Sequence, residues 1–178
     1  MSLVKKLADR WTVMTGGLFT FVLGLDAPVA LEATPATILA TYIINELALA
    51  TDPGDGAAWP MYVSSMPDGS DVENDCGCCY DTTGVKQFRL MNGIHQEKFG
   101  IQLRIRSVAY TDGFAKAESI ATSLDAVNRA SVVYEGETYT LVSVNRQGPV
   151  TPLGVEREGT ERRDLFTVNF LVKMLRVA

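Results

Sequence analysis

The sequence is poor in the side chains that most enzymes use near neutral pH. It contains one histidine, His95, among 178 residues. It has no G-x-S-x-G nucleophile motif, and no lysine follows a spaced pair of glycines as in a phosphate-binding loop. Histidine is the side chain whose ordinary pKa lies closest to neutrality, so a single copy leaves little scope for acid–base catalysis. We therefore expect no enzymatic activity and no cofactor.

Positive charge is also scarce. The chain has 16 lysines and arginines against 21 aspartates and glutamates, which gives a formal net charge of −5. Proteins that bind nucleic acid or anionic membranes usually carry an excess of basic residues. This balance argues against both kinds of partner for the chain as a whole.

Long apolar runs are absent as well. The uncharged run over residues 11–25 contains three threonines and three glycines, and it is too short to span a bilayer. Lys5 and Lys6 precede it, as in a secretion signal, but Asp9 and Arg10 separate them from the run. We expect neither a membrane span nor a secretion signal.

The three cysteines lie within four residues, at Cys76, Cys78 and Cys79. An odd, crowded set is no disulfide framework, so we expect free thiols in a protein made in the cytoplasm. A metal-binding or redox domain that uses these cysteines and His95 is an alternative. The spacing departs from that of paired zinc knuckles, and adjacent cysteines would have to turn toward one ion. Our first expectation is therefore that the chain has no metal site.

Acidic residues gather ahead of these cysteines. Residues 51–85 contain seven acidic residues and no lysine or arginine. Four of them stand just before the cysteine cluster: Asp68, Asp71, Glu73 and Asp75. The pattern lacks the alternation of an EF-hand calcium loop. It predicts a solvated acidic loop that stays mobile unless a partner orders it.

Periodicity predicts two helices and several strands. The helices cover residues 35–50, with Thr34 as the N-cap, and residues 113–128, with Asp112 as the N-cap. The strands are predicted at residues 57–63, 85–91, 99–108, 131–134, 138–144 and 165–177. In the strand 99–108 an apolar face opposes a face with Gln102, Arg104 and Arg106. Residues 145–164, rich in glycine and proline, predict a long connection.

This order of elements predicts an α+β fold. We expect a mainly antiparallel or mixed sheet of five to six strands, two main helices on one face, and a long inter-strand loop. Residues 34–178 would form this single domain. Residues 1–33 would form an N-terminal arm or extension, which could pack on another copy.

Three stretches support a resemblance to a known family. The first is the helix over residues 35–47 and the strand over 59–63. The second is residues 99–106, then Tyr110 and the helix 114–128. The third is residues 141–144, the polar segment 146–154 and the strand 166–171. In this order they resemble the tail terminator (tail completion) proteins of tailed bacteriophages, which are related to phage minor capsid proteins.

The resemblance implies a structural virion protein. Tail terminators form a ring, typically of six copies, that caps the tail tube and presents a face to the neck. The implied partners are other copies, the tail tube protein, a neck or head-completion protein and, in a contractile tail, the sheath protein. DNA would only pass through the channel, and no membrane is involved. The protein would be made in the bacterial cytoplasm and end at the tail–neck junction. A stopper or adaptor is the alternative within head–tail joining.

Two sets of charged residues become candidates in such a ring. Negative charge facing a channel would repel DNA phosphates, and the candidates for that wall are Asp68, Asp71, Glu73 and Asp75. Arginines of the long loop could pair with Glu156, Glu158 or Asp164 of the next copy. The interface candidates are Arg146, Arg157, Glu158, Arg162 and Arg163.

Overall fold

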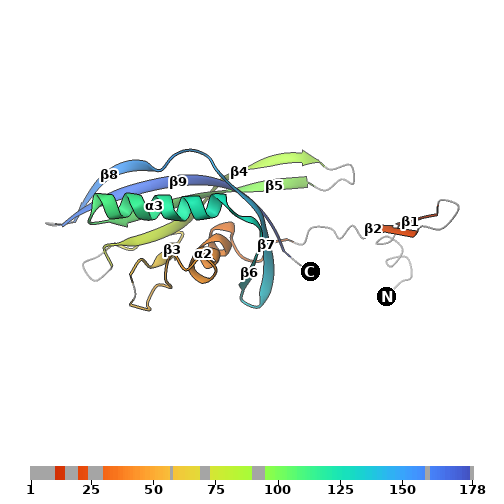
Figure 1. Ribbon diagram of the computed structural model, residues 1–178, viewed down its shortest axis with the longest axis horizontal. Helices are drawn as coiled ribbons and strands as arrows, with labels where there is room; N and C mark the ends of the chain where they lie inside the picture. The colour runs from red at the N-terminus through yellow and green to blue at the C-terminus, as the bar shows by residue number, and fades with distance from the viewer. Residues whose placement is uncertain are drawn as a thin grey trace.

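The computed structural model describes residues 11–14, 20–23, 30–56, 58–68, 73–89, 95–158 and 161–176. Its main body is one sheet with two helices (Figure 1). The strands of this sheet are β3 (Met61–Val63), β4 (Cys76–Arg89), β5 (His95–Ser107), β6 (Asn128–Tyr134), β7 (Glu137–Arg146), β8 (Thr151–Glu158) and β9 (Glu161–Arg176). The helices are α2 (Pro35–Asn45) and α3 (Tyr110–Asp125). The expected α+β class is confirmed.

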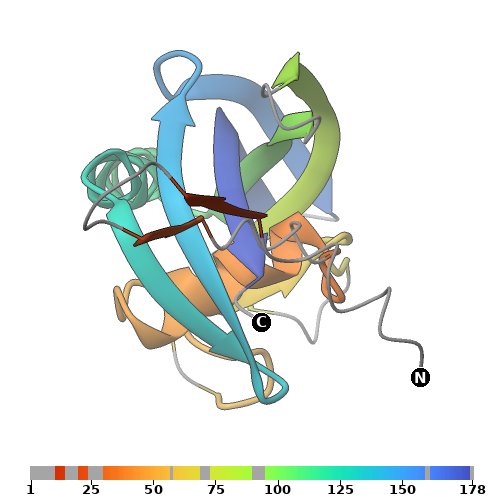
Figure 2. The same cartoon turned by 90° about the vertical axis from the view of Figure 1, so that its right-hand side faces the viewer.

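The strand order in the sheet is β3-β4-β5-β9-β7-β6, and β8 also pairs with β9. β9 is long enough to pair with β5 along one edge, while β7 and β8 follow each other along its other edge. β3 runs parallel to β4, and the other pairs are antiparallel, so the sheet is mixed. Seen end-on, the sheet is strongly curled (Figure 2).

The core lies on the face of the sheet that carries both helices. On β9 the alternate residues Phe166, Val168, Phe170, Val172 and Met174 are buried, as their spacing predicts. The register places β5 residues Ile101, Leu103 and Ile105 beside them. Apolar residues of both helices complete this cluster: Ile38, Leu39 and Ile43 of α2, with Ala117, Ile120 and Leu124 of α3. Burial of this surface is the main contribution to the stability of the fold.

Local signals explain where α2 begins and ends. Thr34 caps its start, because the Thr34 hydroxyl accepts a hydrogen bond from the backbone N–H of Thr37. The helix ends at Asn45, five residues before the predicted end. Beyond it Leu47 bonds to the Tyr42 carbonyl, and Ala48 adopts a positive φ of 50°. Leu47 in this turn still packs against the core. The helical spacing of apolar residues therefore continues beyond the end of the helix, which is why the prediction made the helix too long.

The start of α3 differs from its prediction. The N-cap residue is Ala109 rather than Asp112, and no side chain caps this end. Asp112 instead lies in the first turn, where a carboxylate interacts favourably with the helix dipole. The next residue, Gly113, fits closely on the sheet, because a Cβ there would lie 2.7 Å from the Phe166 ring. Close packing of α3 therefore depends on glycine at this position.

Two predicted loops are strands in the structure. The sequence predicts the next strand only from residue 85, but β4 begins at Cys76 and includes all three cysteines. The long inter-strand loop over residues 145–164 is wrong, because β8 and the start of β9 form a hairpin there. Pro152 and Gly154 flank an irregularity in the β8–β9 register. A β-bulge accommodates such residues within a strand, which is why their presence did not predict one.

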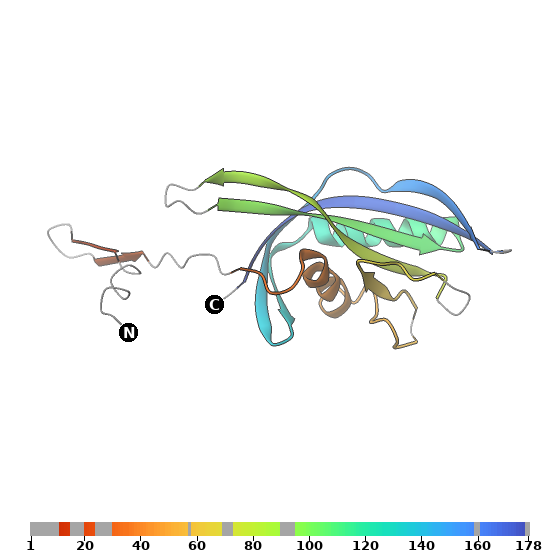
Figure 3. The ribbon, with the colours of Figure 1, turned by 180° about the vertical axis from the view of Figure 1, so that it is seen from behind.

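The N-terminal strands β1 (Trp11–Met14) and β2 (Thr20–Leu23) form a separate two-stranded sheet. Figures 1 and 3 show this hairpin apart from the seven-stranded sheet. No helix in the described part of the chain combines the length and apolar character needed to cross a membrane.

Candidate interaction site

A segment of the chain crosses the sheet on the face opposite the helices. Because β3 and β4 are parallel neighbours, the chain must return along the sheet between the end of β3 and the start of β4. The backbone N–H of Ser64 bonds to the Cys79 carbonyl at 2.9 Å. Farther along, the carbonyls of Pro67 and Glu73 reach Arg106, which stands opposite Cys76 in the register. We call residues 64–68 and 73–75 the crossing segment.

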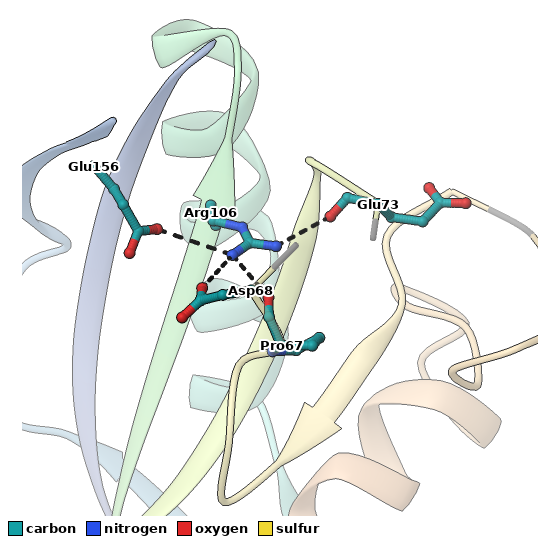
Figure 4. Close-up of polar contacts among 5 residues, drawn as sticks. All are labelled: Pro67, Asp68, Glu73, Arg106 and Glu156. Carbon is teal, nitrogen blue, oxygen red and sulfur yellow. Dashed lines mark hydrogen bonds and ion pairs between the residues drawn. The ribbon is translucent and has the colours of Figure 1, made fainter. Parts of the chain in front are cut away.

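The side chain of Arg106 on β5 binds the crossing segment to the sheet through hydrogen bonds (Figure 4). Its side chain is fully buried, although it is charged. Nη1 donates to the Pro67 carbonyl at 2.9 Å and to the Asp68 carboxylate at 3.2 Å. Nη2 donates to the Glu73 carbonyl at 3.3 Å. One guanidinium thus holds the segment at two points, mostly through main-chain oxygens.

The β8–β9 hairpin reaches the same place. The carboxylate of Glu156 on β8 lies 3.9 Å from Nη1 of Arg106. Glu156 stands opposite Arg163 of β9 in the register, and Arg163 is only 1% exposed. The Arg106 guanidinium therefore links β5 to the crossing segment and lies close to the hairpin, on which Arg163 is also buried. The fork of donors on arginine suits it to hold several oxygens at once.

The chemistry of this site is that of attachment rather than reaction. Arginine stays protonated at any ordinary pH, so it cannot take up a proton. The neighbouring Cys76 is also a poor nucleophile, because burial raises the pKa of its thiol to about 11 even though Arg106 lowers it. Burial likewise raises the pKa of Cys78 and Cys79. All three cysteines are free thiols.

Three of the four acidic channel candidates lie on the crossing segment, which is bonded to β5 and is not a free loop. Asp68 accepts a hydrogen bond from Arg106, yet its side chain is 72% exposed. Asp75 accepts from the backbone N–H of Val108 at 3.0 Å. Glu73 bonds through its carbonyl, and its carboxylate points away from Arg106 (Figure 4). Asp71 lies outside the described residues.

The arginine candidates divide into buried and exposed residues. Arg146 pairs with Glu118 of α3 through two hydrogen bonds of 2.9 and 2.7 Å. Arg163 is buried at the site above. Arg157 is exposed, and Arg162 is 63% exposed beside Asp164 of the same chain. Glu158 stands opposite Glu161 in the register near the tip of the hairpin.

The four residues of the alternative metal site are not brought together. Strand alternation places Cys79 on the helix-bearing face, where its sulfur lies 3.9 Å from that of Met61. Cys76 stands opposite Arg106 at one end of β5, and His95 begins the other end. Among the described residues there is no group of three or more histidine, cysteine or acidic residues placed to hold a metal.

Sequence reasoning did not identify Arg106 as the residue at the centre of this site. It placed Arg106 on the outer, basic face of a half-buried strand, which is where the structure has it. The signal that points to it is the stretch of seven acidic residues without lysine or arginine, because such a stretch needs basic partners elsewhere in the chain. A basic strand face adjacent in the sheet is the natural counterpart.

Comparisons with known proteins leave the family open. No family model matches this sequence, and no curated protein matches it significantly. One solved chain, whose name describes no function, is 15% identical. The match covers 65% of this chain and 79% of that one, with a TM-score of 0.31. A likeness at this level supports no inference about function.

Proposed function

We propose that this chain is a structural virion protein, a bacteriophage tail terminator without enzymatic activity. It would form a ring of six copies that caps the tail tube and joins it to the neck. Its partners would be its own copies, the tube protein and a neck or head-completion protein. The proposal begins from the resemblance of residues 34–178, and the fold class expected from that reading matches the α+β sheet.

The observation that carries the proposal is a pair of ribbons that extend beyond the body. β9 pairs with β5 only over residues 99–107, while β4 and β5 remain paired as far as Arg89 and His95. The outer part of β4–β5 is thus a two-stranded ribbon that projects from the sheet (Figures 1 and 3). On it Val85 is 49% exposed. Two-stranded ribbons are marginally stable alone, and contact with a neighbouring subunit would stabilise this one.

The tip of the β8–β9 hairpin is the second ribbon. Its register sets Arg157 opposite Arg162 and Glu158 opposite Glu161. Like charges directly opposite each other destabilise a pair of strands. Charges of the opposite sign on a neighbouring subunit would offset that repulsion. This supports the use of Arg157, Glu158 and Arg162 in contacts between copies.

The other candidate functions have less support. A stopper is usually a small β-rich barrel, whereas this chain has two helices that contribute to the core. A metal-binding or redox domain needs accessible or converging thiols, and all three cysteines are buried on two faces of β4. The acidic residues Asp68 and Glu73 remain candidates for a channel wall that repels DNA.

Arrest of tube growth tests this proposal. Purified chain is added to polymerising tail tube protein from the same phage, at about six copies per tube end. We expect growth to stop at the length present on addition, with a ring visible at the tube end. Bovine serum albumin at equal concentration controls for nonspecific effects. Tubes that keep growing at saturating concentrations of the chain would contradict the proposal.

A further inference from the structure

The strand β6 forms an open edge of the main sheet. It is the last strand in the order of the sheet, and β7 is its only strand partner among the described residues. Arg129, near the start of β6, carries a charge and has a positive φ of 55°. Residues 130–134 carry no charge and no proline, and Val133 is 58% exposed. Natural sheets usually protect an open edge with a charged side chain, a proline or a bulge. Residues 130–134 have none of these features and are suited to pair with another strand.

The hairpin geometry shows which groups β6 offers. Tyr134 pairs with Glu137 across a two-residue turn in which Glu135 and Gly136 have positive φ values. In such hairpins the residues that flank the turn exchange hydrogen bonds, and the next pair does not. Alternation from Tyr134 therefore turns the backbone groups of Ser131 and Val133 outward. These groups are available to an added strand.

The same chain contains an unattached pair of strands. β1 and β2 pair with each other over four residues each, and no other strand in the described ranges of the chain joins them. The register places Val13 opposite Phe21, and Trp11 opposite Leu23. A two-stranded sheet of this size is not stable by itself in water. It requires a further surface, and its uncharged residues match the uncharged residues 130–134 of β6.

The arm leaves the body beside β6. Leu31 and Ala33 pack against the core where the described chain resumes. Between them Glu32 pairs with Arg176, which also pairs with Glu137, the residue opposite Tyr134 of β6. Nevertheless, both side views show β1 and β2 apart from the main sheet (Figures 1 and 3).

We propose that the β1–β2 hairpin of one copy adds to the β6 edge of a second copy. The inference rests on the proposed ring, for which it names the contact between neighbours. The donor surface differs from the acceptor surface, so the contact is head-to-tail, and such contacts close into rings when the rotation permits. Main-chain hydrogen bonds from Ser131 and Val133 supply the affinity, as in other cases of strand addition.

Complementation between two full-length variants tests the contact. Ser131→Pro removes one outward N–H of β6 and leaves the arm intact, with Ser131→Thr as its control. Val13→Asp with Phe21→Asp sets two like charges opposite each other in the arm and leaves β6 intact. Val133→Lys provides a second edge variant that keeps every backbone donor. Sedimentation velocity over a range of concentrations measures association.

We expect the wild-type chain and Ser131→Thr to self-associate as concentration rises. Each defective variant alone should associate at least about tenfold more weakly. An equimolar mixture of an edge variant with the arm variant should form a heterodimer, because each supplies what the other lacks. Any of three results would overturn the inference. The mixture could stay monomeric, the variants could associate like the wild type, or the wild-type chain could remain monomeric at every concentration. Tube arrest by the variants at wild-type concentrations would overturn the arm contact and leave the proposed function standing. If the variants form the heterodimer but the wild-type chain does not arrest tube growth, the arm contact stands and the proposed function is overturned.

Discussion

At the scale of single residues, Arg106 shows how this fold accommodates a charge without access to solvent. The carbonyls of Pro67 and Glu73 replace part of the hydrogen bonding to water that the guanidinium loses on burial, and Asp68 supplies an opposite charge. Burial of a charge is costly unless its hydrogen bonds are replaced. The cost is offset here because the same bonds fix the crossing segment.

Arg106→Ala should therefore destabilise the chain by about 3 kcal/mol, since two carbonyls lose their donor and a large side chain leaves a cavity. The crossing segment should also become sensitive to proteolysis. Urea unfolding and limited proteolysis measure the two effects. The matched control is Arg104→Ala, at a half-exposed position on the same face of β5, with a loss within about 1 kcal/mol. Equal losses in the two variants would contradict this account of Arg106.

The buried thiols make stability depend on alkaline pH. Burial raises the pKa of Cys76 from its usual 9.0 to about 11, so the unfolded chain loses this proton at lower pH than the folded chain does. The free energy of unfolding should be level below about pH 9 and fall as the pH rises toward 11. Urea unfolding across this range measures it. Cys76→Ala should decline less steeply, and an identical decline would exclude Cys76 as a cause.

At the scale of elements, the fold depends on contacts that tie helices and hairpins to the sheet. α3 is joined to the end of β7 by Arg146 and Glu118, whose side chains are 18% and 34% exposed. Arg146 also donates through Nε to the Gly148 carbonyl at 2.7 Å. This arginine, predicted as an interface residue, thus has partners within its own chain.

A double-mutant cycle of Glu118→Gln and Arg146→Gln should give a coupling energy of about 1 kcal/mol at neutral pH. The hydrogen bond from Arg146 lowers the pKa of Glu118 below its usual 4.5. The coupling should therefore persist above pH 4.5 and disappear as the pH falls through the lowered pKa. Unfolding at neutral and acidic pH measures it. A cycle between Arg146 and Asp112, also on α3, should give a value near zero. A coupling that grows on acidification would contradict this assignment.

The β8–β9 hairpin tip offers a test of the subunit contact. Arg157→Glu with Arg162→Glu changes two exposed side chains, but it also removes the partner of the buried Asp164 carboxylate, so urea unfolding must first show that the variant is folded. The same change should weaken tube arrest at least about tenfold, since it reverses two charges at the contact. Titration of growing tubes measures this, with Arg157→Gln plus Arg162→Gln as an intermediate control. Arg163 is unsuited to such a test because it is buried. Full activity of the reversed variant would remove the tip from the interface.

Elements whose apolar residues recur at a regular spacing could be predicted from the sequence. Elements whose position depends on pairing with a distant strand could not. The alternation of Phe166 to Met174 predicts its buried face correctly. The β8 strand was missed because Pro152 and Gly154 are typical of loops, and only pairing with β9 accommodates them at an irregularity. The attachment of Asp68 to Arg106 joins positions 38 residues apart, and no local pattern encodes that contact.

At the scale of the whole molecule, the central claim is that the chain acts by shape and self-association. Among the described residues, its two ribbons and the open β6 edge are the surfaces that would make such contacts. A net charge of −5 per copy would make a ring strongly acidic, which suits a channel through which DNA slides.

Electron microscopy of phage particles assembled without this chain tests that claim most directly. A tail terminator sets where tube growth ends, so its loss should give tails of excessive and variable length that are not joined to heads. Supplying the wild-type chain in the same host should restore uniform, attached tails. Tails of normal length joined to full heads in its absence would contradict the account.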